Sequence, residues 1–285
     1  MKKLKTILEM IKFEHTVFAL PFAYLGMVLG AGGLPDARTF TWITVAMVGA
    51  RSYAMAINRL IDRRIDTRNP RTQHWPLQQG SITALETGAF VLCSFLVFLV
   101  AVFKLPDLCR WLWPAVIIPM TLYPFLKRFT WLSHLVLGMC LGCAPLGAWI
   151  AVTSSFPPAG ILALGLAVML WTAGFDIIYS CQDYDFDRRE QLHSIPVRFG
   201  IPRALTITRV LHGVTVILLL MTGISFSLGT VFYAGVMCIA LFLWYENRIV
   251  SPEDLSRINV SFFTLNGFVS IFAFVFTFLA VFLKF

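Results

Sequence analysis

The chain has 285 residues, of which 58% are hydrophobic and only 13% are charged. Its apolar runs repeatedly reach the roughly 20 residues that cross the hydrocarbon core of a bilayer, so the composition excludes a water-soluble globular protein and indicates a polytopic membrane protein. The net charge of +8 is explained by basic residues gathered on one side of the membrane together with any anionic substrate, and it does not require a nucleic acid partner.

The apolar runs predict an all-α fold of nine transmembrane helices, because runs of about 18 or more apolar residues are the sequence signal of such helices. The fourth run is short and contains three prolines, which membrane helices tolerate. The first run is too long for a signal peptide and no small-residue cleavage site follows it, so we expect it to remain as a span. In chain order the predicted spans are 13–32, 39–57, 83–103, 111–126, 132–152, 159–178, 206–223, 228–245 and 260–283.

The basic residues predict which side each loop faces, since lysine and arginine in short loops stay on the cytoplasmic side. With nine spans and a cytoplasmic amino terminus, 17 of the 23 basic residues fall on the cytoplasmic side, and two, Arg51 and Arg209, lie within spans. We therefore expect a protein of the bacterial inner membrane whose amino terminus and most charged loops face the cytoplasm. The remaining four basic residues fall on the opposite side: Arg38, Lys104, Arg110 and Lys284.

Two predicted cytoplasmic segments, one after the second span and one after the sixth, share a pattern. The first contains Asp62-xxx-Asp66 followed by Pro76-xxx-Gly80, and the second contains Asp183-xxx-Asp187 followed by Pro196-xxx-Gly200. Matching positions are offset by 120 to 121 residues, which suggests two four-helix halves and a final ninth helix. We expect the two segments to face one another across a single cavity.

The spacing of the aspartates indicates a metal site. Residues four apart lie on one face of a helix, so Asp62 and Asp66 share a face with Asn58 one turn earlier, and Asp183 and Asp187 are arranged in the same way. Neighbouring carboxylates repel one another unless a cation lies between them, and hard oxygen ligands of this type suit Mg²⁺. In the alternative interpretation the acids pair with adjacent arginines on a solvated surface. Ionisable groups at the ends of two membrane-spanning helices nevertheless favour a functional site.

The surroundings of these motifs indicate the kind of substrate. Tyr179 and Asp176 lie one and two turns before Asp183 and are expected on the same face, whereas Asp185 is expected to point away from it. Two magnesium-binding clusters beside basic residues and an apolar interior suit a lipid diphosphate, whose loss from an allylic chain leaves a carbocation that an electron-rich aromatic ring attacks. A rival interpretation is a secondary transporter, although transporters place their ionisable groups near the bilayer midplane.

Four stretches of the sequence resemble motifs of the UbiA superfamily of intramembrane prenyltransferases. They are NRLIDRRID at 58–66, NPRTQHWPLQQG at 69–80, YPFLKR at 123–128 and DIIYSCQDYDFD at 176–187, which HSIPVRFG follows. The resemblance extends over essentially the whole chain, so residues 1–285 are interpreted as a single transmembrane prenyltransferase domain. It implies a nine-span helical bundle and magnesium-dependent transfer of a polyprenyl chain from its diphosphate to an aromatic ring, usually in quinone biosynthesis.

The resemblance also implies roles for individual residues. Asp176 and Tyr179 are expected over the reacting centre, where a carboxylate or a phenol steadies the allylic cation or takes the ring proton. The planar guanidinium of Arg128 suits the acceptor's carboxylate and gives this residue a part in catalysis. The residues expected to hold magnesium are Asn58, Asp62 and Asp66 for one ion and Asp183 and Asp187 for the other. Those expected to bind the diphosphate or the acceptor are Arg71, Tyr123, Lys127, Arg128 and His193.

Three positions depart from the family's pattern. Arg59 stands where the common motif has aspartate, Trp75 where it has arginine, and His193 where many members have lysine. The first change removes a possible metal ligand and the second removes a cation, while His193 still offers a donor to phosphate. As a whole the pattern is most similar to 4-hydroxybenzoate polyprenyltransferases, some of which resemble enzymes that prenylate 1,4-dihydroxy-6-naphthoate for menaquinone. Both acceptors are phenolic carboxylates, and haem or a chlorophyll precursor is the alternative acceptor.

The remaining polar residues within spans have simpler expected roles, with one exception. Arg51 lies two helical turns deeper than Asn58, where it either reaches the substrate from inside the cavity or makes a structural ion pair or snorkels to the interface. His134 and His212 fall near helix ends and are expected to be structural, and Asn266 is expected to make an interhelical hydrogen bond. The CxxC formed by Cys140 and Cys143 favours helix packing over metal or redox chemistry.

Overall fold

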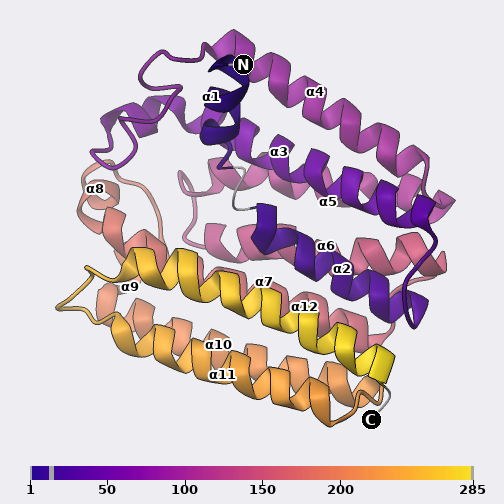
Figure 1. The fold of residues 1–285 in the computed structure, drawn as a ribbon. Helices are drawn as coiled ribbons and strands as arrows, with labels where there is room; N and C mark the ends of the chain where they lie inside the picture. Colours follow the sequence, from indigo (N-terminus) through magenta and orange to yellow (C-terminus); the bar gives the residue numbers. More distant parts are fainter. Residues whose placement is uncertain (1, 13–15, 284–285) are drawn as a thin grey trace.

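The computed structural model describes residues 2–12 and 16–283, and within these residues it contains helices and no strand (Figure 1). The predicted all-α fold is therefore confirmed for the described part of the chain. A 3₁₀ turn, Cys181–Asp183, and a π-helical turn, Val260–Leu265, accompany the α-helices. The α-helices are α1 (Lys2–Met10), α2 (Thr16–Ala31), α3 (Ala37–Arg68), α4 (Ala84–Phe103), α5 (Asp107–Leu126), α6 (Ser133–Thr153), α7 (Ala159–Ser180), α8 (Tyr184–Arg189), α9 (Ile195–Phe199), α10 (Ile201–Ser225), α11 (Thr230–Ile249) and α12 (Asn266–Leu283).

Seven helical segments of the described residues are long and apolar enough to cross a bilayer, so the chain is an integral membrane protein. Two of the nine predicted spans are not among the seven. The span predicted at 13–32 begins outside the described residues, and the apolar helix within it, Ala19–Ala31, is shorter than a full span. The span predicted at 111–126 lies in α5, whose 20 residues include three prolines. The predicted count of nine is therefore not confirmed.

The long helices lie side by side in one bundle (Figure 1). Helices that follow one another in sequence mostly pack together: α3 against α4 and α5, α6 against α5 and α7, and α7 against α10. The carboxyl-terminal helix α12 packs against both α11 and α2, and α2 packs in turn against α6. The chain therefore closes into a ring of helices in which α2 and α6 bridge the middle.

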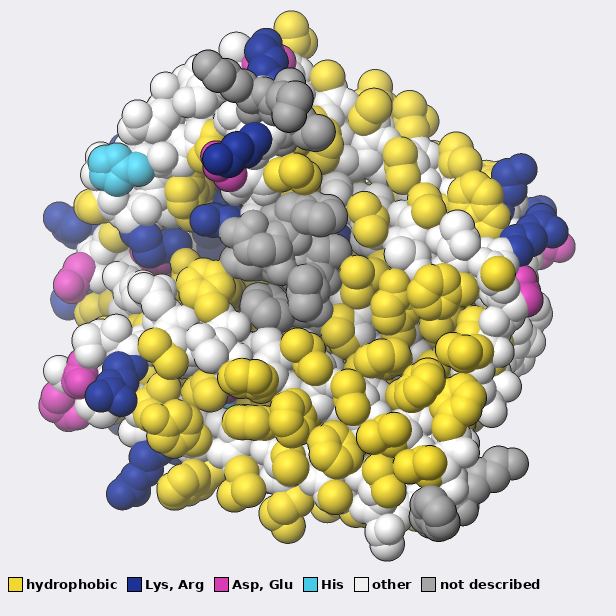
Figure 2. All heavy atoms as spheres, in the orientation of Figure 1, with side chains coloured by type: hydrophobic (Ala, Val, Ile, Leu, Met, Phe, Trp, Pro, Cys, Tyr) yellow, Lys and Arg dark blue, Asp and Glu magenta, His cyan; other side chains and the backbone are white. Residues whose placement is uncertain are grey.

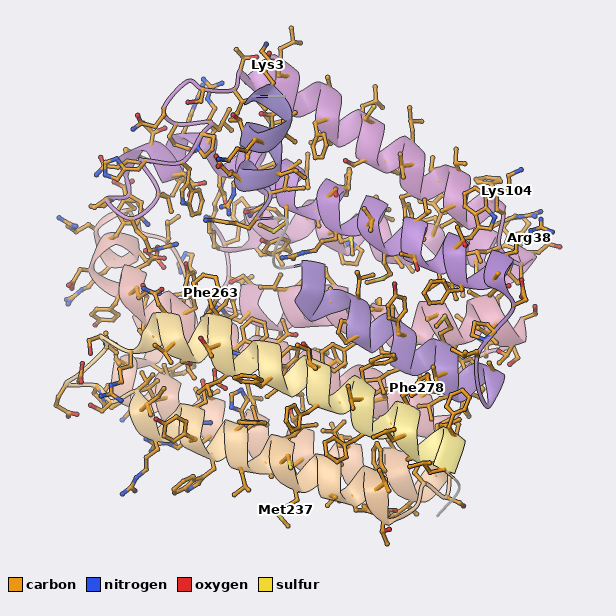
Figure 3. All side chains as sticks on the ribbon, viewed as in Figure 1. Lys3, Arg38, Lys104, Met237, Phe263 and Phe278 are labelled. Carbon is orange, nitrogen blue, oxygen red and sulfur yellow. The ribbon has the colours of Figure 1, made fainter. Side chains whose placement is uncertain are left out.

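The outward faces of the outer helices are apolar. On α4, Leu92, Leu96 and Val100 follow one another at four-residue intervals and are about half exposed, and the 20 residues of this helix span about 30 Å, which matches the hydrocarbon core. Figure 2 shows hydrophobic side chains over the flank of the bundle and charged side chains mainly toward its ends. Arg38 and Lys104 lie at one end (Figure 3), whereas α8 and α9 lie at the other (Figure 1). This distribution is that of a bundle surrounded by lipid.

Both helices that carry the aspartate motifs differ from their predicted form. α3 continues to Arg68 as a single helix of 32 residues, so the first motif lies on the last turns of a long helix that extends well beyond the predicted span. α7 ends at Ser180, and the turn Cys181–Asp183 separates it from α8. The continuous helical face predicted from Asp176 to Asp187 is therefore interrupted, because a 3₁₀ turn advances the side chains by a different angle from an α-helix.

The glycines of the repeated Pro-xxx-Gly pattern have similar backbone conformations. Gly80 has φ +72° and Gly200 has φ +81°, a region that glycine enters at little cost because it has no Cβ. Gly80 lies before α4, and Gly200 lies directly before α10. The repeat in the sequence thus places a glycine with positive φ after each of the two aspartate motifs.

A buried polar network links the last two helices to α7. Asn266 accepts from the indole N–H of Trp171 (2.7 Å) and donates to Oε1 of Glu246 (2.9 Å), which also accepts from the hydroxyl of Ser261 (2.7 Å). The interhelical hydrogen bond predicted for Asn266 is therefore confirmed. Glu246, which is fully buried, is a residue that the sequence did not single out.

Helices α6 and α7 approach closely through glycines. A Cβ at Gly138 would overlap the carbonyl oxygen of Met169, and one at Gly142 would overlap that of Gly165. Glycine at these positions lets the two helix backbones touch, as small residues commonly do in membrane helix pairs. This contact sets the distance between the helices that carry His134 and Asp176.

The substitution Gly138→Ala is expected to destabilise the protein by about 1–3 kcal/mol, because the added methyl group forces α6 and α7 apart. The matched control is Gly147→Ala on the same helix, where a Cβ meets nothing within 4 Å and alanine favours the helix. Thermal unfolding of the two variants in detergent measures the difference. Equal melting temperatures for both variants would contradict the close packing.

Candidate active site

A polar cavity of about 300 Å³ lies among α3, α7 and the segments that follow them, and most of the predicted site residues line it. Both aspartate motifs contribute to it, so the prediction that they share one cavity is confirmed. Among the predicted site residues, Arg128 does not line the cavity but contacts Asp62 behind it. Those that line it are Arg51, Asn58, Asp62, Asp66, Arg71, Tyr123, Lys127, Asp176, Tyr179, Asp183, Asp187 and His193.

The two motifs are joined by hydrogen bonds from the segment after α3 to Asp183. Asn69 donates from Nδ2 to Oδ1 (2.9 Å), and Arg71 donates from Nε to Oδ1 (3.0 Å) and from a terminal nitrogen to Oδ2 (2.6 Å). A further nitrogen of Arg71 donates to the hydroxyl of Tyr179 (3.0 Å). Burial lowers the pKa of Arg71, but its hydrogen bonds to Asp183 and the charge of that carboxylate outweigh this effect and raise the pKa above its ordinary value. Arg71 is therefore a permanent cation in the wall of the cavity.

Asp62 of the first motif is bound by cations from the end of α5. Its Oδ2 lies 2.6 Å from Nζ of Lys127, and its Oδ1 lies 3.3 Å from Arg128, which also donates to the carbonyl of Ile61 (2.9 Å). Asn58 donates to Oδ2 (3.2 Å). The side chain of Asp62 is only 4% exposed, so these partners are required to compensate its desolvation.

The alternative in which the motif pairs with adjacent arginines on a solvated surface is wrong for α3. Asp62 and Asp66 are buried, whereas Arg63 and Arg64 are exposed on the other face of the helix. Asp185 is also exposed, which confirms that it points away from the cavity. The charged run thus divides into a face that belongs to the site and a face that meets water.

The carboxylates of the two motifs are the oxygen donors that the cavity offers to a divalent cation. Within residues 2–12 and 16–283, no three His, Cys, Asp or Glu side chains are gathered closely enough to hold a metal ion in this arrangement. The chemistry of the donors nevertheless fits Mg²⁺, which prefers carboxylate oxygens. Asp66 is buried and its Oδ2 has no hydrogen-bond partner among the described residues, while Asp62 and Asp183 are held by cations. The residues therefore fit the metal in kind, and Asp66 contributes a buried carboxylate oxygen that has no hydrogen-bond partner among the described residues.

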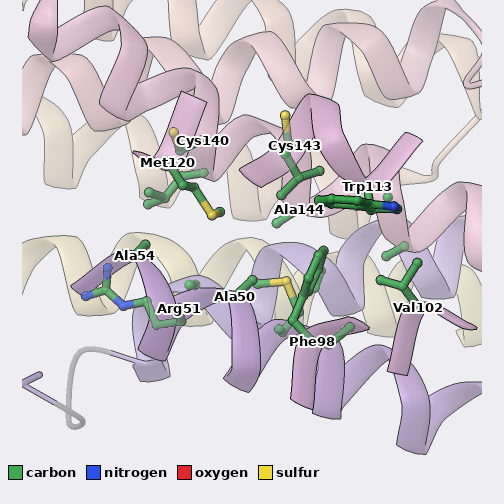
Figure 4. A pocket seen from close by; sticks show the side chains of 18 of the residues that line it. Ala50, Arg51, Ala54, Phe98, Val102, Trp113, Met120, Cys140, Cys143 and Ala144 are labelled. Atoms are coloured by element: carbon green, nitrogen blue, oxygen red, sulfur yellow. The ribbon is translucent and has the colours of Figure 1, made fainter. Parts of the chain in front are cut away.

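An apolar cavity of about 150 Å³ (Figure 4) adjoins the polar one, since the two share lining residues. Arg51 and Tyr123 line both cavities. Figure 4 shows Arg51 and Ala54 of α3 on one side of the cavity and Met120 and Cys140 on the other. The six cysteines are free thiols, and those of the CxxC line this apolar cavity, in agreement with a packing role. A charged compartment and an apolar compartment therefore meet at Arg51.

Arg51 has an unusual environment for a cation within a membrane span. No ion pair joins it to a described residue, and its buried Nε has no hydrogen-bond partner among them. The structural ion pair considered as its alternative role is therefore not formed with any described residue. An arginine left without a counter-ion inside a cavity is costly, so its position favours contact with an anion.

The two departures at positions 59 and 75 form a single contact. The guanidinium of Arg59 lies 3.5 Å from the centre of the Trp75 ring, a cation–π distance. Arg59 is 8% exposed and donates from Nε to the carbonyl of Met10 (3.3 Å). Since both residues line the polar cavity, the positive charge missing at position 75 is supplied from position 59.

Three features of the cavity wall were not predicted. His134 lies 2.7 Å from Asp176, Asn69 bonds to Asp183, and the ring of Tyr179 packs 4.1 Å from that of Phe262. Asn69 is part of the motif NPRT and could have been found there. His134 and Phe262 belong to none of the motifs, and only the packing of α6 and of the π-helical turn against α7 brings them to the site.

The fold and the cavities define a helical membrane protein that places two acidic motifs and several cations at the mouth of an apolar interior. The chain belongs to the UbiA prenyltransferase family, whose model matches residues 19–272, and it is therefore a prenyltransferase. This assignment excludes the secondary transporter considered from the sequence.

Two curated relatives are named 4-hydroxybenzoate octaprenyltransferase. That of Aliivibrio fischeri (strain ATCC 700601 / ES114) is 30% identical over 232 residues, which cover 80% of this chain and 79% of the relative. That of Xanthomonas euvesicatoria pv. vesicatoria (strain 85-10) is 32% identical over 230 residues, which cover 79% and 74%.

Solved structures share the fold. The apo structure of a UbiA homolog from Aeropyrum pernix K1 has a TM-score of 0.83 and 33% identity, and the match covers 92% of this chain and 96% of that one. A UbiA homolog from Archaeoglobus fulgidus bound to GPP and Mg²⁺ has a TM-score of 0.76 and 19% identity, with 97% and 99% covered. The helical bundle of this chain is thus the fold of the family.

Replacing Arg71 by lysine is expected to lower kcat/KM for prenyl transfer by about tenfold to a hundredfold. Lysine keeps the charge but loses the forked geometry, and hydrogen bonds to a charged partner contribute about 1.5–3 kcal/mol. The control is Arg68→Lys, because Arg68 pairs with Glu190 at 2.7 Å with a side chain that is 59% exposed, and such surface pairs contribute little. Steady-state kinetics of both purified variants give kcat/KM for each. Similar kcat/KM values for the two variants would argue against a role for the forked guanidinium of Arg71.

Proposed function

We propose that this protein transfers a polyprenyl chain from polyprenyl diphosphate to a phenolic carboxylate, with 4-hydroxybenzoate as the acceptor, in quinone biosynthesis. The observation that carries the proposal is the arrangement of both aspartate motifs around one polar cavity that opens into an apolar one. The charged head of a lipid diphosphate matches the first cavity and its hydrocarbon chain matches the second. The names of the curated relatives support the same acceptor.

The cations of the polar cavity are suited to the diphosphate. Lys127 and Arg71 hold carboxylates of the two motifs, and an arriving diphosphate competes for both of them. A fixed set of positive charges in a site with little water stabilises the negative charge that grows on the leaving group. Arg59, held on the ring of Trp75, adds a further positive charge to the same wall.

Mg²⁺ is the proposed cofactor, held by Asn58, Asp62 and Asp66 on one side and by Asp183 and Asp187 on the other. When bound, it neutralises the diphosphate and stabilises it as it leaves. The relative from Archaeoglobus fulgidus with GPP and Mg²⁺ and the unpaired oxygen of Asp66 support this assignment.

The acceptor's position follows from the remaining residues of the cavity. Nε of Arg51 has no hydrogen-bond partner among the described residues, and the side chain lies where the two cavities meet. Arg51 is therefore the proposed partner of the acceptor's carboxylate, whereas Arg128 positions Asp62. Asp176 and Tyr179 line the same polar cavity and are proposed to face the reacting carbons. Tyr179 and Phe262 present aromatic rings, whose faces attract a cation.

The proposed location of the active site is the cytoplasmic side of a bacterial inner membrane. With the amino terminus inside, 17 of the 23 basic residues fall on that side, in accordance with the positive-inside rule. Cytosolic acceptors and a membrane-embedded prenyl chain then reach the cavity from opposite directions. Naphthoate acceptors share the phenolic carboxylate and remain the second candidate.

The variants Asp62→Asn and Asp183→Asn are each expected to lower magnesium-dependent product formation by roughly a hundredfold or more, because each loses a carboxylate charge from the proposed metal site. Asp185→Asn is the matched control, since this residue belongs to the second motif but is exposed. Product is measured after chelation and stepwise return of Mg²⁺. Unchanged magnesium dependence in both site variants would remove the basis of the metal assignment.

The substitution Arg51→Met is expected to raise KM for 4-hydroxybenzoate by about tenfold or more, because a charged hydrogen bond is lost, and to leave KM for the diphosphate unchanged. Arg209→Met is the control, because Arg209 is also within a span but is exposed. Mass spectrometry of products from 4-hydroxybenzoate, 1,4-dihydroxy-6-naphthoate and a phenol without a carboxylate identifies the acceptor. Equal use of the neutral phenol would contradict recognition of a carboxylate.

A further inference from the structure

His134 lies in the wall of the polar cavity and hydrogen-bonds to Asp176, which lines the same cavity. It lies in the first turn of α6, is 4% exposed, and its Nδ1 is 2.7 Å from Oδ2 of Asp176 on α7. The Asp176 side chain is 25% exposed and lines the polar cavity. A buried imidazole therefore holds a carboxylate that lines the proposed substrate cavity.

The hydrogen bond at Nε2 of His134 identifies the protonation state of the imidazole. The backbone N–H of Ile195 donates to Nε2 of His134 (3.3 Å), so Nε2 carries no proton. The bond from Nδ1 to Asp176 is then one in which the imidazole N–H donates and the carboxylate accepts. An imidazolium, which has a proton on both nitrogens, could not make both contacts.

The start of α9 explains why the N–H of Ile195 is available. Ser194 caps this helix by accepting at its hydroxyl from the N–H of Val197 (3.3 Å), which leaves the N–H of Ile195 among the first-turn groups without an intrahelical partner. The imidazole satisfies that group. His134 is thus held at both nitrogens and cannot rotate without exposing two unsatisfied polar groups.

This arrangement orients Asp176 and leaves one of its oxygens uncommitted. Oδ2 is occupied by His134, while no hydrogen bond to Oδ1 is formed by the described residues. The proton-accepting capacity of the pair therefore lies on Oδ1 of the aspartate. The histidine itself is unable to accept, because Nδ1 already carries a proton and Nε2 is engaged by the backbone.

We propose that His134 is a positioning residue that holds Asp176 as the acceptor of the ring proton, an inference that rests on the proposed function. In the transfer, the carbon–oxygen bond of the prenyl diphosphate breaks and the diphosphate leaves with the electron pair. The ring carbon then forms a bond to the prenyl carbon. Loss of the proton from that ring carbon to Oδ1 of Asp176 returns the electrons to the ring, and the carboxylic acid later releases the proton to water.

The test compares wild type with His134→Ala, His134→Asn and His134→Gln, using acceptor that carries hydrogen or deuterium at the ring position to be prenylated. Asn places an amide N–H near the position of Nδ1, whereas Gln places it near Nε2. His134→Ala and His134→Gln are expected to lower kcat by about tenfold or more with KM for the diphosphate unchanged. His134→Asn is expected to restore most of the activity.

The deuterated acceptor separates positioning from general damage. With Asp176 disordered, proton loss becomes slow enough to limit the rate, so the ratio of kcat for protonated to deuterated acceptor is expected to rise in His134→Ala and His134→Gln. His212→Ala serves as control, because it removes another buried histidine that packs against α7 at Gly174 and is expected to leave the isotope ratio at the wild-type value.

The outcomes distinguish this inference from the function on which it rests. If wild type forms no prenylated product, the proposed function fails and this inference fails with it. An active wild type whose Gln variant matches the Asn variant in kcat and in isotope ratio would overturn the role of His134 alone. Should His134→Ala not fold, the comparison of Asn with Gln still decides the question, since both keep a polar side chain of similar size.

Discussion

The structure depends on burying carboxylates at one end of the helical bundle. Their burial is possible because cations from other segments of the chain form ion pairs with them. Asp62 is buried against Lys127 and Arg128, and Asp183 is bound by the fork of Arg71. Each pair joins segments far apart in sequence, so the charges that make the site also bring α3, α5 and α7 to one place. Removing either partner would leave an uncompensated charge, which costs far more than the pair contributes.

The same pairs prepare the cavity for an anionic substrate. Cations that hold carboxylates in the free protein are already oriented when a diphosphate enters, and little reorganisation is then needed. The boundary with the apolar cavity is set by Arg51 and Tyr123, which line both. In the proposed function, a lipid diphosphate has one cavity for its head and the other for its chain, and Asp176 and Tyr179 line the first of these cavities.

Much of the site could be predicted because its residues lie in short motifs. The spacing of Asp62 with Asp66 and of Asp183 with Asp187 implies that each pair shares a helical face. The repeated glycines, Gly80 and Gly200, both have positive φ angles in the structure. The sequence could not reveal that a 3₁₀ turn separates Asp176 from Asp183, or that Arg59 packs on Trp75 and replaces the cation missing there. Nor is the count of nine spans confirmed, because neither α5, with its three prolines, nor the apolar helix Ala19–Ala31 is among the seven segments of the described residues that are long and apolar enough to cross a bilayer.

The sequence by itself determined that the protein lies in a membrane, that it is helical, and what chemical kind of site it has. These properties follow from the length of the apolar runs, the distribution of basic residues and the spacing of the carboxylates, which all involve residues near one another in the sequence. Tertiary structure alone decided which cation meets which carboxylate, where the two cavities join, and that His134 hydrogen-bonds to Asp176. Those contacts join α3 to α5, α6 to α7 and the turn at Ile195 to α6. The geometry of these contacts follows from the distances between packed helices, and no local sequence pattern specifies those distances.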